Sequence, residues 1–363
     1  MWERRLFAQL LHKLRGGQLT LLEGGRPQVY GQAAPDGLTA HLQVHDPAFY
    51  RQALLGGEIG MGEAFMAGHW SSPDLVSLVR LAVRNADSLD QSHAWLNWLP
   101  RAWNRLRHLL RDNTQSGSRE NIRRHYDLSN DFFQLWLDPS LMYSSALWRQ
   151  DHETLTQAQY NKLHRACSQL ALGPSDHLLE VGTGWGTLAL YAAENFGCQI
   201  TTTTISRQQY ELAAERIARA GLAGRIQLLL EDYRELKGRF DKAVSIEMFE
   251  AVGFKHYDAF FSKLTGLLQP GAPFLLQTIT MNEQRFPAYI QSTDWIQQYI
   301  FPGGELSSVL EIEKSLARTG PYRLVDRRDF GLDYARTLAH WRSVFHQRID
   351  EVRRLGFDQP FER

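Results

Sequence analysis

The stretch Glu180-Val-Gly-Thr-Gly-Trp-Gly186 decides how this chain of 363 residues is interpreted. It overlaps the end of the apolar run His177–Val181 and leads into a helical pattern over residues 185–196, so it forms a turn between a strand and a helix. Glycines in such a turn let the backbone pass close to a ligand, and the start of the helix offers unpaired amide groups. The stretch therefore predicts a nucleotide-like ligand at the carboxyl end of a strand.

Strands and helices alternate around this turn from about residue 155 onward, which is typical of a parallel α/β sheet. The predicted strands are His177–Val181, Gln199–Thr204, Ile226–Glu231, Phe240–Ile246, Pro273–Thr280 and Tyr322–Phe330. Predicted helices cover residues 155–172, 185–196, 207–220, 255–268 and 305–319. We therefore predict an α/β fold, with a Rossmann-like class I methyltransferase domain whose sheet is mostly parallel.

Three features favour S-adenosylmethionine over a dinucleotide as the ligand. The glycine spacing is E-x-G-x-G-x-G instead of G-x-G-x-x-G, and the second strand ends in threonines where a nicotinamide ribose requires an acid. The third strand ends in an acid and an aromatic residue, which can meet an adenine. The predicted cofactor-binding residues are Gly182, Gly184, Gly186, Thr204, Gln209, Asp232 and Tyr233.

Length and composition predict a two-domain globular protein. We expect a small mixed N-terminal domain over residues 1–91, a basic and aromatic linker or helix over 92–118, and the methyltransferase domain over 119–363. The formal net charge is zero, so no overall field attracts nucleic acid, and we predict no such partner. The His and Cys residues lack metal-ligand spacing, and we predict no metal site.

Several further blocks of sequence occur in a distinctive order. They are His125-Tyr-Asp-Leu-Ser-Asn130, Tyr143-Ser-Ser-Ala-Leu-Trp148, Thr204-Ile-Ser206 with Gln209, Glu231-Asp-Tyr-Arg234, Met248-Phe-Glu-Ala-Val-Gly253, Tyr299-Ile-Phe-Pro-Gly303 and Phe330-Gly-Leu-Asp-Tyr334. With these blocks the chain resembles, from about residue 41 to its C-terminus, the cyclopropane fatty acyl phospholipid synthase family. The resemblance implies methyl transfer from S-adenosylmethionine to a double bond in the acyl chain of a membrane phospholipid, in an enzyme of the bacterial two-domain type.

The resemblance also implies how the site is built. Tyr143 and Ser144 are implied to approach the methionine end of the cofactor. Methyl attack on an alkene leaves a carbocation, and aromatic faces stabilise cations, so the candidate rings are those of Tyr143, Trp148, Phe249 and Tyr334.

Family enzymes are similar in using a bicarbonate ion as the base, and the residues implied to hold it here are Glu250, Tyr334 and the backbone of Ile279. Two positions differ from the family. Ser145 stands in place of a cysteine, and Gln277 stands in place of a histidine. Serine and glutamine still donate hydrogen bonds to an anion, but neither supplies the charge of an imidazolium.

Glu247 is an additional carboxylate, three residues before Glu250, at a position where small residues are common in the cyclopropane-forming members. Two acids at the end of a strand can share a proton, one of them acting as the base. The alternative is that Glu247 simply binds a backbone amide or solvent. If the base is displaced, a different proton leaves, so a methylene-branched or methyl-branched chain is an alternative product to a cyclopropane.

Two basic, aromatic segments suit an anionic bilayer surface, one over residues 1–15 and one over 95–111. We select Arg101, Arg105, Arg107 and Arg111 as the phosphate-contacting residues. The other interpretation is that each helix packs its apolar stripe on its own domain. No apolar run reaches the roughly 20 residues of a membrane span. We predict a cytoplasmic protein, peripheral at the inner membrane surface, with a homodimer as one alternative.

The family continues beyond the stretch that resembles Gly356-Phe-Asp-Gln-Pro-Phe361, so we expect a shortened C-terminal end and one strand fewer in the sheet. Two other functions stay open. One is a methyltransferase for a small amine or phenol, against which the N-terminal domain argues, because a dissolved substrate needs no docking domain. The other is a non-catalytic lipid- or cofactor-binding protein, against which the intact glycine turn and Glu250 argue.

Overall fold

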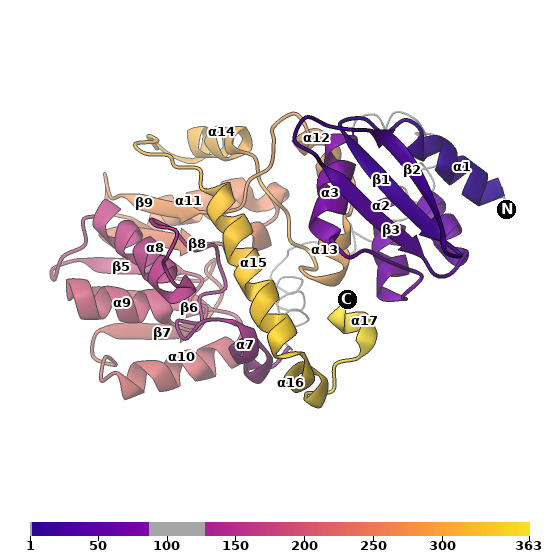
Figure 1. Cartoon of the computed structure of the whole chain (residues 1–363). Coiled ribbons are helices and arrows are strands. Elements are labelled where there is room, and N and C mark those ends of the chain that lie inside the picture. Colours follow the sequence, from indigo (N-terminus) through magenta and orange to yellow (C-terminus); the bar gives the residue numbers. More distant parts are fainter. Residues whose placement is uncertain (1, 87–127) are drawn as a thin grey trace. The chain divides into compact units, whose positions relative to one another are not determined.

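A computed structural model of the chain describes residues 2–86 and 128–363 (Figure 1). Its contacts divide the chain into two compact units. Unit 1 contains the N-terminal residues with the short segments Ser292–Gln298 and Phe357–Arg363, and unit 2 contains the rest. The predicted domain boundaries and the predicted linker over residues 92–118 lie outside the described residues, as do the arginines selected for phosphate contact, and they stay predictions.

Unit 1 is a mixed sheet with helices, as the sequence predicts. Its strands pair in the order β2-β1-β3-β4, and only the β1–β3 pair is parallel. The strands are β1 (Gly17–Glu23), β2 (Arg26–Gln32), β3 (Thr39–Val44) and β4 (Trp70–Ser71). The helices are α1 (Trp2–Leu11), α2 (Ala48–Met66), which is kinked at Gly57, and α3 (Leu75–Arg84).

Helix α1 is shorter than the predicted helix over residues 1–15, and it ends at Leu11. Leu11 is buried in the core of unit 1, with Phe7 packed against the same core. Arg4 on this helix forms an ion pair with Glu23 of β1 at 2.7 Å. The apolar stripe of this segment therefore packs on its own domain, which is the second of the two interpretations made from the sequence.

Unit 2 contains a five-stranded sheet in which all neighbouring strands are parallel, in the order β7-β6-β5-β8-β9 (Figure 1). The strands are β5 (His177–Val181), β6 (Gln199–Thr204), β7 (Ile226–Leu230), β8 (Lys242–Ile246) and β9 (Phe274–Gln277). Chain order reverses beside β5, because β6 lies on one side of it and β8 on the other. Ligands of open α/β sheets bind at such a reversal, outside the carboxyl ends of the strands.

Helices cover both faces of this sheet. Successive residues of a strand point to opposite faces, so neighbouring residues of β5 pack against different helices. Leu178 of β5 packs in a core cluster with residues of α8 (Leu155–Gln169), α9 (Thr187–Phe196) and α10 (Arg207–Arg219). Its neighbour Leu179 packs in a second cluster with residues of α11 (Tyr257–Leu267). Partly buried residues of α14 (Val309–Thr319) pack against this second cluster. The fold is thus the α/β, Rossmann-like arrangement that the sequence predicts.

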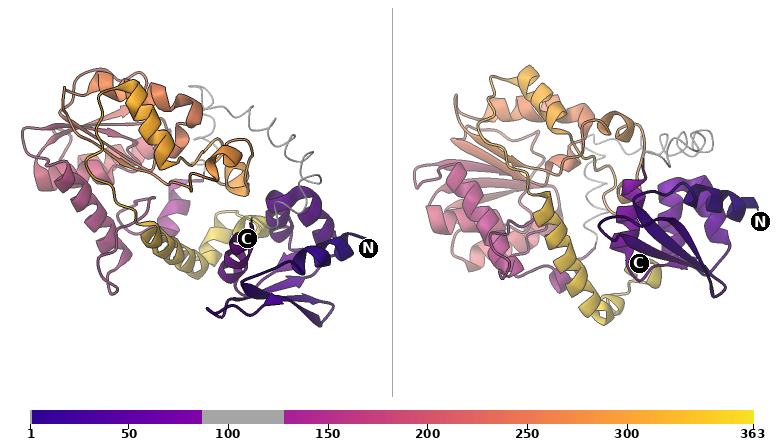
Figure 2. Two further views of the ribbon diagram at one scale, coloured as in Figure 1. Left: turned by 90° about the horizontal axis from the view of Figure 1, so that it is seen from above. Right: turned by 45° about the horizontal axis from the view of Figure 1, so that its top comes forward.

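Other helices of unit 2 follow or precede the sheet. They are α7 (Asn130–Trp136), α12 (Phe286–Tyr289), α15 (Gly331–Gln347), α16 (Ile349–Arg354), and the short 3-10 turns η1 (Phe249–Ala251) and η2 (Phe254–His256). Helix α17 (Gln359–Glu362) belongs to unit 1, and α13 (Trp295–Tyr299) belongs to unit 1 except for its last residue. Figure 2 shows these elements in two further views. Within the described residues, no helix is long and apolar enough to cross a membrane.

The predicted strand Tyr322–Phe330 is wrong, because these residues form an extended segment that pairs with no strand of the sheet. Leu324 and Val325 are 56% and 85% exposed, so the apolar residues that suggested a buried strand do not enter the core. The Tyr322 hydroxyl instead accepts a hydrogen bond from the Thr265 hydroxyl at 2.8 Å, and Asp326 pairs with Arg165 of α8. The predicted strand Pro273–Thr280 is real but shorter, since β9 ends at Gln277.

Candidate active site

The glycine turn after β5 is built for close approach by a ligand. Gly182 and Gly184 have φ angles of 103° and 53°, in the left-handed region that side chains disfavour. A Cβ at Gly182 would lie 2.9 Å from the Cβ of Met248, whereas a Cβ at Gly184 would meet no atom within 4 Å. Hydrogen bonds to β6 hold the turn in place, because the amides of Gly182 and Thr183 both donate to the Thr203 carbonyl.

A chain of buried hydroxyls supports the same turn. The hydroxyl of Thr183 contacts that of Thr202 at 2.7 Å, and Thr202 donates to Glu180 at 2.6 Å. Burial raises the pKa of Glu180 to about 8, so this first acid of the motif is held mainly in its neutral form at pH 7. Gly186, also with a positive φ, caps α9, and the Trp185 indole donates to Asn130 of α7.

The ends of β6 and β7 carry the other predicted cofactor residues. The hydroxyl of Thr204 donates to the Gln209 side chain at 2.8 Å, which fixes both residues at the start of α10. Asp232 follows β7 and accepts from the guanidinium of Arg234 at 2.7 Å and 2.8 Å. The Tyr233 ring packs edge-on against Phe260, and burial raises its pKa to about 12. All of these residues lie at the carboxyl ends of neighbouring strands.

Tyr143 and Ser144 lie on the segment that leads from α7 to α8. The Tyr143 ring is surrounded by rings of Phe133, Trp136 and Trp341, with centroids between 5.3 Å and 5.5 Å away. The Ser144 hydroxyl accepts a hydrogen bond from the ammonium of Lys162 at 2.6 Å. Because an ammonium has only donors, the hydrogen of that hydroxyl points elsewhere.

Lys162 lies on the buried face of α8 and is only 4% exposed. Burial lowers its pKa to about 8, against the opposing negative charges of Glu247 and Asp138. Lys162 is not among the site residues predicted from the sequence. The sequence nevertheless contains a signal for its burial. Lys162 falls four residues after Ala158 and four before Ala166, so this charged residue lies on the apolar stripe of an amphipathic helix.

Glu247 follows β8 directly and has a φ of 47°, which is rare for a residue with a side chain. Its carboxylate Oε1 accepts from the backbone amide of Ser145 and from the Gln277 side chain, each at 2.8 Å. Burial raises the pKa of Glu247, while the positive charge of Lys162 and the two hydrogen bonds oppose the rise. The hydrogen bond from the Ser145 backbone amide agrees with the alternative interpretation of the sequence, in which Glu247 binds a backbone amide.

Glu250 lies on the turn that follows, and its carboxyl group faces the end of β9. Its Oε1 accepts from the Thr278 hydroxyl at 2.9 Å and from the Ile279 backbone amide. Its Oε2 is buried and has no hydrogen-bond partner among the described residues. Burial, and then the charge of Glu247, raise the pKa of Glu250 to about 7. A carboxylate with one unpaired oxygen and a raised pKa can accept a proton near neutral pH.

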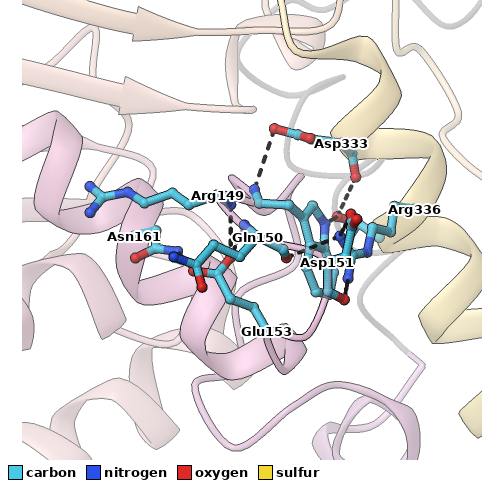
Figure 3. Close-up of polar contacts among 9 residues, drawn as sticks. Arg149, Gln150, Asp151, Glu153, Asn161, Asp333 and Arg336 are labelled. Atoms are coloured by element: carbon cyan, nitrogen blue, oxygen red, sulfur yellow. Dashed lines mark hydrogen bonds and ion pairs between the residues drawn. The ribbon is translucent and has the colours of Figure 1, made fainter.

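Helix α15 brings Tyr334 to the two acids. Burial and then the charges of Glu247 and Glu250 raise the pKa of Tyr334. The helix is tied to the segment that contains Ser145, because the amide of Ala146 donates to the Thr337 hydroxyl at 3.1 Å. Figure 3 shows the adjoining contacts, in which Asp333 accepts from the Trp148 amide and Arg336 donates to the Asp151 carbonyl.

The structure therefore gathers the predicted catalytic residues in one place, although not with the predicted contacts. Ser145 and Gln277 are hydrogen-bonded to Glu247, and Ile279 is hydrogen-bonded to Glu250, so the site consists of two adjoining hydrogen-bonded sets. Two aromatic candidates do not line it. Phe249 is completely buried against Tyr257 and Phe260, and the Trp148 ring is covered by Arg336 at 3.8 Å. No cluster among the described residues has three or more side chains suited to a metal ion.

Comparison with known proteins identifies this arrangement. The family model described as mycolic acid cyclopropane synthetase matches residues 113–363. The chain belongs to this family. It is 38% identical to the tuberculostearic acid methyltransferase UfaA1 of Mycobacterium tuberculosis, over 91% of this chain and 78% of the relative. It is 37% identical to the cyclopropane-fatty-acyl-phospholipid synthase of Escherichia coli K12, over 84% of this chain and 76% of that one.

A solved structure of a family member agrees with the fold. The mycolic acid cyclopropane synthase CmaA1, complexed with SAH and CTAB, matches with a TM-score of 0.62 and 30% identity, over 67% of this chain and 88% of that chain. This chain is accordingly a methyltransferase that depends on S-adenosylmethionine. The open space at Gly184 and the strand ends that carry Thr204 and Asp232 fit that cofactor.

A separate bicarbonate ion, which the family resemblance implies, does not fit these residues. The amide of Ser145 and the side chain of Gln277 already donate to Glu247, and the amide of Ile279 donates to Glu250. The Ser145 hydroxyl, expected to hold the ion, donates to the Ala146 carbonyl at 3.1 Å. Three of the donors expected for a free anion therefore bind carboxylates of the chain itself, and the Ser145 hydroxyl binds a backbone carbonyl, so we assign no step to bicarbonate.

The glycine turn gives a direct prediction for cofactor binding. Gly182→Ala places a side chain at a disfavoured φ and in contact with Met248, so the turn or Met248 must shift from its present position. We expect the affinity for S-adenosylhomocysteine, measured by isothermal titration calorimetry, to fall about tenfold or more. Gly221→Ala is the control, since Gly221 has a φ of 70° but open space. Equal affinities for the two variants would contradict the role of this turn.

The raised pKa of Glu250 predicts how stability depends on pH. A carboxyl group that is more basic in the folded state favours folding at low pH, and this contribution is lost as pH rises towards about 7. Relative to Glu250→Gln, the wild-type free energy of unfolding should therefore fall between pH 5.5 and 8, by on the order of 2 kcal/mol. Urea unfolding at several pH values measures this difference. A difference that does not change with pH would show that Glu250 titrates normally.

Proposed function

We propose that this enzyme transfers a methyl group from S-adenosylmethionine to the double bond of an unsaturated acyl chain of a phospholipid, forming a cyclopropane ring. The observation that carries the proposal is the unpaired, buried oxygen of Glu250, whose negative charge acts on Tyr334. The names of family members support the acceptor, since they describe cyclopropane synthases of fatty acyl phospholipids and mycolic acids.

The proposed reaction produces a carbocation on the acyl chain and releases one proton. Residues of the protein must stabilise the carbocation and accept the proton. S-adenosylmethionine, when bound, supplies an electrophilic methyl group and leaves as the neutral thioether. One alkene carbon forms the new carbon–carbon bond, and the other becomes a carbocation. Aromatic rings around Tyr143 stabilise positive charge and exclude water, which would otherwise trap the cation. Glu250 then accepts one proton through Oε2, and the electron pair of the broken C–H bond closes the ring.

A branched product is the second candidate, because the pocket for the base differs from the family pattern. The Gln277 side chain donates a hydrogen bond to Glu247 close to Glu250. The position from which a base can act therefore differs from that in the family pattern. The relative at 38% identity is named a tuberculostearic acid methyltransferase and not a cyclopropane synthase. A 1,2-hydride shift in the same carbocation would move the positive charge to the methylated carbon. Loss of a proton from the new methyl group would then leave a methylene-branched chain, and loss of a proton from a neighbouring chain carbon would leave a methyl-branched alkene.

The acceptor proposed here requires contact with a bilayer. We propose that the protein works in the cytoplasm as a peripheral protein at the inner membrane surface. One supporting feature is the outer face of α3 in unit 1, where Val76, Val79 and Val83 are between 55% and 61% exposed. These residues follow helical spacing and would present one apolar stripe to lipid.

Labelled product analysis tests the proposal. The protein is incubated with S-adenosylmethionine carrying a fully deuterated methyl group and with vesicles of a monounsaturated phospholipid, and the fatty acid methyl esters are then separated and analysed by mass spectrometry. A cyclopropane is expected to retain two deuterium atoms, as a methylene product would, and chromatography separates these two. A methyl branch would retain three. Transfer only to a dissolved amine or phenol, or no transfer to lipid, would contradict the proposed function.

A further inference from the structure

The position of Glu247 is unusual in three independent ways. Its backbone has a positive φ of 47°, its carboxyl group is removed from solvent, and one carboxylate oxygen collects hydrogen bonds from two distant segments. Ser145 lies before α8, and Gln277 ends β9. A residue in a disfavoured backbone conformation persists only where its surroundings fix it. The site therefore holds this carboxylate at a cost in local conformation.

The surroundings also match the charge of Glu247. Burial raises the pKa of Glu247 and lowers the pKa of Lys162, and the charge of each group opposes the shift of the other. The same ammonium is anchored by Ser144, one residue before Ser145. A buried cation that faced no anion would lose its proton, and a buried anion without donors would gain one. The two groups therefore stabilise each other in their charged forms.

We propose, as an extension of the proposed function, that Glu247 is a built-in anion that makes this enzyme independent of any free anion. Its carboxylate occupies the donors of Ser145 and Gln277, and the positive charge of Lys162 opposes the effect of burial on it. Glu250 has a different role, because its Oε2 has no hydrogen-bond partner among the described residues. Glu247 is thus the fixed negative charge, and Glu250 is the proton acceptor beside it. Lys162 is a positioning residue that acts through Ser144 and Glu247.

The test removes the carboxylate and offers a replacement. Glu247→Gly suits the positive φ and leaves the donors of Ser145 and Gln277 without an acceptor. Formate or bicarbonate can then enter. Glu247→Gln is the matched control, because it fills the same space and keeps an acceptor oxygen without the charge. Methyl transfer to vesicles of a monounsaturated phospholipid is measured for all three proteins in bicarbonate-free buffer, with and without added formate or bicarbonate.

We expect the wild type to keep its full rate without bicarbonate. Both variants should lose about tenfold or more of the rate, which corresponds to roughly 1.4 kcal/mol or more of transition-state stabilisation. Formate or bicarbonate should restore at least part of the rate of Glu247→Gly and none of that of Glu247→Gln. A wild-type rate that falls when bicarbonate is removed would overturn the proposal, and this measurement needs no variant. Failure of both anions to rescue a folded Glu247→Gly protein would overturn it as well.

Binding of ¹³C-labelled formate, followed by NMR, separates this proposal from the proposed function. Glu247→Gly should bind formate, and the wild type and Glu247→Gln should not. If no protein methylates lipid but formate binds in this pattern, the proposed acceptor is wrong and the built-in anion stands. If the wild type methylates lipid but binds formate as Glu247→Gly does, the built-in anion is wrong and the proposed function stands.

Discussion

Two carboxyl groups that lie away from water at the end of one strand are the constraint on which the site depends. Glu247 and Glu250 are close enough for the charge of one to raise the pKa of the other. Such a pair is costly to bury unless donors and a counter-charge are supplied. Here the donors are two backbone amides, an amide side chain and a hydroxyl, and the counter-charge is the ammonium of Lys162.

The sheet topology explains how these groups meet. β8 and β9 are parallel neighbours, so the acids after β8 and the donors at the end of β9 lie at the same edge. β5 is the other neighbour of β8, which places the glycine turn beside the acids and brings Gly182 against Met248. Helix α15 and the segment around Ser145 are tied together through Thr337, and they close the site from outside the sheet. Strand order therefore places the glycine turn beside the acid pair, whereas α7, α15 and the segment before α8 supply the aromatic cluster.

The sequence predicted most of the sheet, because its strands are apolar runs bounded by turns, and β5 and β6 match their predicted limits. It failed at Tyr322–Phe330, where apolar residues are exposed on an unpaired segment, since strand pairing depends on distant partners. The catalytic group was predicted from motifs, but the bonds within it were not. Whether the Ser145 hydroxyl or its amide faces Glu247 depends on the path of the backbone, and the burial of Lys162 depends on how α8 packs.

The central claim is that Glu247 occupies the anion position of the site while Glu250 stays available as the base. A crystal structure of the protein with S-adenosylhomocysteine, grown in the presence of bicarbonate, tests this claim most directly. The account predicts that the Glu247 carboxylate lies between the Ser145 amide and the Gln277 side chain, as described here. A separate bicarbonate ion bound to Ser145, Gln277 and Ile279, with Glu247 turned away from them, would contradict it.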